Sequence, residues 1–258
     1  MVAETTYLKF DEPFAGLHNK SWGPKYNKFG LPILKKLPLT HIPERASVLD
    51  LCCGPGLFLQ WLTNKGYEVT GVDRSEKMLQ YARAKAPDCK LILGDVRFCE
   101  LPTNFYAAFS TGLGFTHMST LDDLLSTFRN TYEALQDNGL FVFDLRLHDG
   151  YNSVWNGSIE RGINNGYAWA KKKRYNPESR EGQVDITVLG FWKRIHTIWP
   201  VRGYTADEVN SALGEAGFTE ISMYNFRSEI MDLVAPDPSW KRIVHFVCYK
   251  RDGNLVTN

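Results

Sequence analysis

A short apolar segment of this chain runs directly into a turn that contains two glycines. Ser47–Leu51 is the apolar segment, and the chain then reads Asp50-Leu-Cys-Cys-Gly-Pro-Gly56. The apolar side chains of Leu57, Leu59, Trp61 and Leu62 follow, and they are expected to form the buried face of a helix. A strand, a tight turn and a helix in this order form the first unit of a parallel sheet.

The same order of strand and helix continues along the chain. Further strands are expected at Tyr67–Val72, Lys90–Leu93, Tyr106–Ser110, Leu140–Asp144, Phe218–Tyr224 and Ile243–Tyr249. Helices are expected after Ser75, at Leu121–Leu135 and from Thr205 to Ala216. Ser75 is a favourable first residue for a helix, and Thr205 with Glu208 has the spacing of a capping box. Alternating strands and helices predict an α/β fold with helices on both faces of the sheet.

The pattern changes between the fifth strand and Thr205. Gly166–Arg174 and Gln183–Trp199 resemble long antiparallel strands, joined through the turn-forming Asn176–Ser179. Residues 147–203 are therefore interpreted as an inserted antiparallel β-subdomain. The sheet domain then comprises residues 41–146 and 204–258, and residues 1–40 form an N-terminal cap. Within the cap, a helix is predicted near Lys25–Leu37, up to its prolines.

Composition narrows the classes of partner. The 258 residues carry a formal net charge of +1, whereas proteins that bind nucleic acids usually have a basic excess. No run of eighteen apolar residues is present, and the N-terminus lacks the pattern of a secretory signal. The five cysteines fit neither a disulfide framework nor a zinc site. These features predict a cytoplasmic protein with reduced cysteines, without a nucleic-acid or membrane partner.

Two carboxylates follow the glycine turn at successive strand ends. Asp73 ends the second predicted strand, where it can accept hydrogen bonds from both hydroxyls of a ribose. Asp95 follows the third strand, where it can accept from an adenine amino group. Ligands bind beyond the carboxyl ends of parallel strands, so these groups together predict an adenosine site. A dinucleotide site is the alternative, but its G-x-G-x-x-G pattern requires a third glycine where this chain has Leu59.

These segments resemble the cofactor motifs of class I S-adenosylmethionine-dependent methyltransferases. The resemblance rests on Val48–Gly56, Val72–Met78, Gly94–Arg97 and Asn138–Asp144, and it extends over about residues 20–250. It implies a seven-stranded, mostly parallel Rossmann-like sheet whose last strand is antiparallel. The insert is similar to that of sugar-amine N,N-dimethyltransferases. The Asp/Asn-Pro-Pro-Tyr motif of nucleic-acid amino methylases is absent after the fourth strand.

The resemblance implies S-adenosylmethionine as cofactor and S-adenosylhomocysteine as product. Its implied cofactor-binding residues are Asp50, Cys52, Gly54, Gly56, Asp73, Arg74, Met78, Asp95, Val96 and Ser110. Trp22 and Tyr26 are added because an aromatic face from the cap attracts the cationic sulfonium.

Residues for catalysis and acceptor binding are harder to predict. His117, just after the fourth strand, is the candidate general base, with substrate orientation as its alternative role. Substrate contacts are predicted at His117, Trp169, Arg174, Arg194 and His196 if they face inward, although a solvated strand face is the other interpretation of Lys171–Arg174. No cluster of ligands suggests a metal.

The expected function is methyl transfer to nitrogen, or alternatively to oxygen, of a small metabolite. A non-catalytic cofactor-binding sensor and a nucleic-acid methylase are the alternatives. A monomer, or a homodimer formed through the β-insert, is expected.

Overall fold

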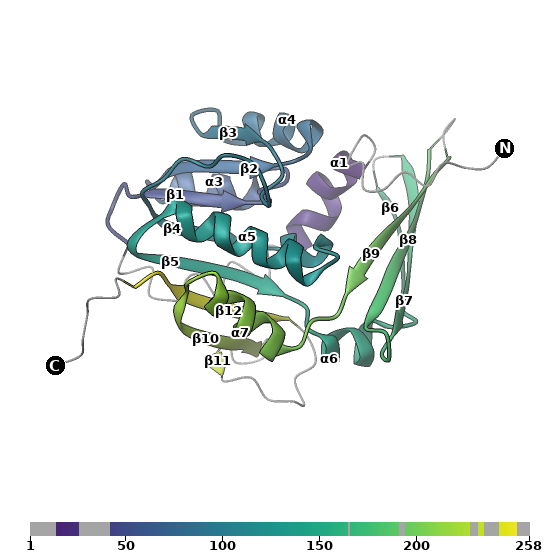
Figure 1. The fold of residues 1–258 in the computed structure, drawn as a ribbon. Helices are drawn as coiled ribbons and strands as arrows, with labels where there is room; N and C mark the ends of the chain where they lie inside the picture. The colour runs from purple at the N-terminus through teal and green to yellow at the C-terminus, as the bar shows by residue number, and fades with distance from the viewer. Residues whose placement is uncertain are drawn as a thin grey trace.

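The computed structural model describes residues 14–25, 42–164, 166–190, 194–227, 232–234 and 243–251. These residues form two β-sheets with helices around the larger one (Figure 1). The larger sheet has the strand order β11-β10-β12-β5-β4-β1-β2-β3, and the smaller has the order β6-β7-β8-β9. None of the helices described has the length and apolar character needed to cross a bilayer.

The larger sheet confirms the predicted α/β fold. Its strands are β1 (Ser47–Leu51), β2 (Glu68–Asp73), β3 (Lys90–Leu93), β4 (Phe105–Ser110), β5 (Leu135–Leu145), β10 (Thr219–Arg227), β11 (Asp232–Val234) and β12 (Val244–Tyr249). Strands β1 to β5 pair in parallel, whereas β12 is antiparallel to both β5 and β10. Seven of these strands follow the predicted arrangement, and the short β11 adds an eighth at the edge.

Helices cover both faces of this sheet. They are α3 (Leu57–Asn64), α4 (Glu76–Lys85), α5 (Leu121–Ala134) and α7 (Ala206–Glu215). Apolar residues of α3 and α4 join one core layer, and those of α5 and α7 join the other. The predicted caps are confirmed, because Ser75 Oγ accepts from Met78 N and Thr205 forms a capping box with Glu208.

The insert forms a separate antiparallel sheet of four strands, β6 (Ile159–Asn164), β7 (Tyr167–Asn176), β8 (Glu181–Leu189) and β9 (Arg194–Arg202). One prediction was wrong here. Gln183–Trp199 is not one strand, because β8 ends at Leu189 and β9 begins at Arg194. Strand β6 was missed. The predicted turn is confirmed, since Asn176 Oδ1 accepts from the Glu178 and Ser179 amides.

The described part of the N-terminal cap, residues 14–25, lies between the two sheets (Figure 1). Helix α1 (Phe14–Leu17) continues into a π-helical turn at His18–Trp22. Phe14, Leu17 and Trp22 join the apolar core on the inner face of the insert sheet. Apart from Lys25, the predicted helix near Lys25–Leu37 lies outside the described residues.

Gly56 shows why the glycine turn has its sequence. Its φ is +77°, and a Cβ there would lie 2.7 Å from Ala82 Cα of α4. Glycine thus permits both the backbone conformation and the close contact between the turn and α4. We expect Gly56→Ala to destabilise the fold by about 3 kcal/mol, from left-handed strain and overpacking together.

The matched control for this prediction is Gly66→Ala. Gly66 has a φ of +91°, but no heavy atom lies within 4 Å of the place that a Cβ would occupy. It should therefore cost only the backbone strain, about 1 kcal/mol. Thermal unfolding measures both, and the Gly56 variant should lose about 6–12 °C in Tm. Equal losses in the two variants would show that the contact with Ala82 is unimportant.

Candidate functional site

A pocket begins at the glycine turn and continues to the inner face of the insert sheet. Its first half is formed by residues at the carboxyl ends of β1, β2 and β3, including Asp50, Asp73 and Asp95. Its second half includes Trp155, Lys171 and Trp199. The parallel strands thus bring the predicted adenosine residues together at one sheet edge, beneath a second wall from the insert.

Asp73 holds the glycine turn in place. Its Oδ2 accepts a hydrogen bond from Gly54 N at 2.9 Å, and its Oδ1 accepts from Ser75 N at 2.9 Å. Burial raises the pKa of the Asp73 carboxyl, and the two amide donors oppose that rise. Each carboxylate oxygen can accept more than one hydrogen bond. Both oxygens can therefore still accept from a vicinal diol such as ribose.

Asp50 is a buried carboxylate at the end of β1 that also lines the pocket. Among the described residues, its Oδ2 has no hydrogen-bond partner. Burial, followed by the nearby charge of Asp73, raises its pKa well above the usual value. A buried polar atom without a partner is costly, so this oxygen fits a donor supplied by a ligand. Cys52 lies beside it with a φ of +54°, and burial raises the pKa of its thiol.

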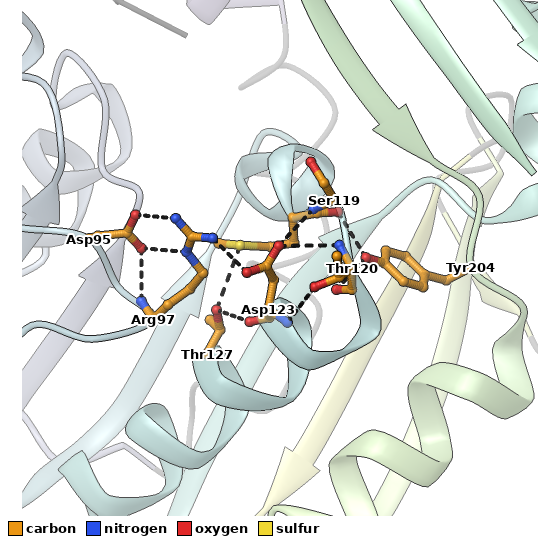
Figure 2. Close-up of polar contacts among 8 residues, drawn as sticks. Asp95, Arg97, Ser119, Thr120, Asp123, Thr127 and Tyr204 are labelled. Atoms are coloured by element: carbon orange, nitrogen blue, oxygen red, sulfur yellow. Dashed lines mark hydrogen bonds and ion pairs between the residues drawn. The ribbon is translucent and has the colours of Figure 1, made fainter. Parts of the chain in front are cut away.

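Asp95 is held by a neighbouring arginine (Figure 2). Arg97 donates from Nε to Asp95 Oδ1 and from a terminal nitrogen to Asp95 Oδ2, and its backbone NH also donates to Oδ1. The hydrogen bonds from Arg97 lower the pKa of Asp95. Oδ2 accepts only one of these bonds, so one acceptor position remains for an adenine amino group.

The other end of Arg97 contacts Asp123, at the start of α5 (Figure 2). Asp123 is the third helical residue, and it forms a capping box with Thr120. Tyr204 OH donates to the carbonyl oxygens of Met118 and Thr120, which belong to the segment before that helix. These contacts connect the end of β3 to the segment that carries His117.

A second carboxylate fixes the loop after β4. Asp144, on β5, accepts hydrogen bonds from Gly112 N at 3.0 Å and Leu113 N at 2.7 Å. Both residues have positive φ, and both line the pocket. Burial raises the pKa of Asp144 to about 6, although these amides oppose the shift. Asp144 therefore positions the pocket wall between the two halves.

The second half of the pocket is aromatic and contains a buried lysine. Lys171 Nζ lies 3.4 Å from the ring centroid of Trp22, and only 4% of Lys171 is exposed. Trp199 contacts the Trp22 ring edge to face, and it contacts His117 in the same manner. Burial, with help from the charge of Arg74, lowers the pKa of His117 to about 3. His117 is thus a neutral imidazole at physiological pH.

The structure brings most of the predicted site residues together. The predicted residues that line the pocket are Trp22, Asp50, Cys52, Gly54, Asp73, Arg74, Met78, Asp95, Val96 and His117. Gly56 and Ser110 are not among the lining residues. Ser110 is fully buried behind the wall, where a Cβ on Gly114 would approach its hydroxyl. Tyr26 lies outside the described residues.

Four predicted substrate contacts do not line this pocket. Arg174, Arg194 and His196 are exposed, and Arg174 pairs with Asp185. Successive side chains of a strand point to opposite faces, and these three belong to the outer face of the insert sheet. Trp169 belongs to the inner face, but it packs against Trp22 without lining the pocket.

The same alternation identifies pocket residues that the prediction missed. Lys171 and Lys173 lie on the inner face of β7 and line the pocket, whereas Lys172 is exposed. The interpretation of Lys171–Arg174 as one solvated face was therefore wrong for Lys171. The period of two in this strand was the available signal, since Lys171 is two residues from Trp169 and four from Tyr175.

Comparison with known proteins adds an independent observation. Residues 48–139 match a family model described as a methyltransferase domain. The matched segment contains the glycine turn, Asp73 and Asp95. The described residues have the fold of class I S-adenosylmethionine-dependent methyltransferases, with inserted antiparallel strands.

Several relatives resemble the methyltransferase domain or the whole fold. The domain is 32% identical over 105 residues to dTDP-3-amino-3,4,6-trideoxy-alpha-D-glucopyranose N,N-dimethyltransferase from Streptomyces venezuelae, covering 41% of this chain and 44% of that protein. The match thus spans less than half of that relative. An S-adenosylmethionine-dependent methyltransferase from Clostridium acetobutylicum has a TM-score of 0.75 at 17% identity, covering 93% and 98% of the two chains. CalS10, an S-adenosylmethionine-bound amino pentose methyltransferase from Micromonospora echinaspora, has a TM-score of 0.68 at 18% identity, covering 95% and 99%.

The residues of the first half of the pocket fit S-adenosylmethionine. Asp73 offers acceptors to a diol, Asp95 offers one to an exocyclic amine, and the unpartnered Asp50 oxygen fits a donor such as an ammonium group. Met78 and Val96 supply buried apolar walls. The match to the methyltransferase family model supports the same cofactor.

Proposed function

We propose that this protein transfers the methyl group of S-adenosylmethionine to an amino nitrogen of a small molecule. The observation that carries the proposal is the continuity of the pocket, which extends from the cofactor residues to a separate wall on the insert sheet. Relatives of the domain act on amino sugars, and we infer an amino sugar as the acceptor class.

The chain contributes position and exclusion of water. When bound, the cofactor supplies a methyl group that its sulfonium already activates. Asp73, Asp50 and Asp95 would hold the cofactor at the strand ends, while Trp22 and Trp199 cover the pocket from the cap and the insert. Correct alignment alone supplies several kcal/mol of barrier reduction in reactions of this kind.

His117 is poorly suited to act as a general base. A base works best when its pKa is near the working pH, and burial has lowered the pKa of His117 to about 3. Its place beside Trp199 suits a role in orienting the acceptor. This assignment favours a nitrogen acceptor, because a hydroxyl generally requires a base or a metal.

We expect His117→Gln to leave the pH dependence of kcat/KM unchanged between pH 5 and 8. Glutamine preserves a neutral donor and acceptor, and the native imidazole does not change its charge in that range. Turnover should fall by no more than about tenfold, since one hydrogen bond is worth about 1 kcal/mol. If kcat/KM of the wild type fell at acidic pH and that fall were absent in the variant, His117 would be the general base.

A direct test uses a panel of amino sugars, free and dTDP-linked, with hydroxyl analogues lacking the amine. Each compound is incubated with protein and S-adenosylmethionine, and a mass increase of about 14 Da per transferred methyl is sought. Methylation of an amino sugar but not its hydroxyl analogue is expected. A cofactor-dependent rise in Tm without methylation of any compound would instead support the non-catalytic binder.

A further inference from the structure

Lys171 has a position that the cofactor site does not explain. It lies on β7, in the insert, and its ammonium group faces the ring of Trp22 from the cap. It is buried and lines the half of the pocket away from the glycine turn. A buried lysine is costly to keep in the charged form, so its presence at this wall calls for a function.

The groups around Lys171 shift its pKa in opposite directions. Glu160 on β6 is the nearby carboxylate, but it already forms an ion pair with Lys173. The positive charges of Lys173 on β7 and Lys25 in the cap disfavour a charged Lys171, whereas the face of the Trp22 ring favours it. Burial is the largest effect, and it lowers the pKa of Lys171 to about 7.

The two histidines that line the same pocket have pKa values too low to exchange a proton near neutral pH. The charge of Lys171 contributes to the low pKa values of His18 and His117, which fall to about 4 and about 3, respectively, with burial as the main cause. All three side chains line the same pocket. Among these three, only Lys171 has a pKa near neutrality.

We propose that Lys171 is a catalytic residue that accepts a proton from the acceptor's ammonium group before methyl transfer. This inference rests on the proposed function. The N–H bond of the acceptor breaks, its electron pair stays on nitrogen, and the proton forms a new N–H bond with Lys171 Nζ. The acceptor is then a neutral nucleophile, and Lys171 is an ammonium ion against the Trp22 face. Lys171 later returns this proton to water, so one proton is released per methyl transferred.

The proposal requires that Lys171 loses its proton near neutral pH, and an NMR titration tests this without turnover. Protein labelled with [¹⁵N]lysine is titrated from pH 6 to 9 with S-adenosylhomocysteine present, and the Lys171 Nζ signal is assigned by its loss in Lys171→Met. The proposal expects this signal to titrate near pH 7. A Lys171 that stays charged throughout would overturn the proposal.

The proposal also requires that methyl transfer depends on a basic side chain at position 171. Steady-state kinetics with the amino sugar identified by the panel test this. Lys171→Arg keeps the charge but cannot accept a proton. We expect kcat/KM to fall at least about 100-fold at pH 7 in this variant, with S-adenosylhomocysteine affinity retained. Lys171→Met should be equally slow at pH 7 and should approach the wild type near pH 10, where the acceptor loses its proton unaided.

Lys172 provides a control on the opposite face of the same strand. Lys172→Met should keep wild-type turnover at every pH. Activity retained in Lys171→Arg would identify Lys171 as an anchor for an anionic group and overturn the proposal. A deficit in Lys171→Met that is constant with pH would also overturn it, as a structural role. If the panel shows no methylated compound, the proposed function fails, while the NMR titration still reports on Lys171.

Discussion

Replacing Asp73 with alanine should weaken S-adenosylhomocysteine binding by at least about 100-fold. The variant lacks the carboxylate that accepts hydrogen bonds from the ribose. Hydrogen bonds to charged groups are each worth roughly 1.5–3 kcal/mol. The substitution would also release the amides of Gly54 and Ser75, which the carboxylate now fixes at 2.9 Å each. Isothermal titration calorimetry with S-adenosylhomocysteine measures the change.

Two further variants make this result interpretable. Asp73→Asn keeps the shape and one acceptor oxygen, so its loss of affinity should be intermediate. Asp88→Ala removes an exposed carboxylate outside the pocket and should bind like the wild type. Circular dichroism of each ligand-free variant verifies the fold. An affinity for Asp73→Ala within about threefold of the wild type would refute the ribose contact.

Lys171→Met should stabilise the protein at pH 7 while reducing its activity. The pKa of Lys171 is about 7 in the folded protein and 10.5 as its ordinary value, so the unfolded chain binds more protons between these pH values. The native lysine therefore destabilises the fold most below pH 7, and this penalty disappears as the pH rises towards 10.5. After loss of the Trp22 contact, we expect a net gain of about 3 kcal/mol at pH 7.

Thermal unfolding as a function of pH measures this effect. The Tm of Lys171→Met should exceed that of the wild type by about 6–12 °C at pH 7, and the difference should become small above pH 10. Lys172→Met, on the exposed face, should show no comparable gain. A Lys171→Met variant less stable than the wild type at pH 7 would mean that the ammonium is well stabilised where it lies.

The sequence predicted the cofactor half of the molecule better than the insert. Ser47–Leu51 and Lys90–Leu93 are strands with the predicted bounds, because each is a short apolar run bounded by turn-forming residues. Strand β6 has an edge position and exposed isoleucines at 159 and 163, so burial leaves little pattern in its sequence. The break between β8 and β9 begins at Gly190 without the polar cluster that usually indicates a turn.

Predictions at the site failed where distant elements decide a side chain's surroundings. Charge alone suggested that Lys171 and Arg174 share a solvated surface, but one is buried against Trp22 and the other is exposed. The contact depends on a tryptophan about 150 residues earlier in the chain, so no local pattern contains it. His117 lines the pocket, but its low pKa arises from burial that only the assembled fold produces.

The insert leaves the larger sheet and returns to it at one narrow neck. His148 N, just after β5, donates to Tyr204 O, just before α7, at 2.8 Å. Two chain segments already joined by a hydrogen bond can be bridged by loops of very different length, because loop closure then costs little extra entropy. We therefore expect that the insert can be exchanged as a unit, provided that the ion pair of Arg180 with Glu208 of α7 is kept. Grafting the corresponding region of a relative at this neck offers a route to new acceptors on an unchanged methyl-donor site.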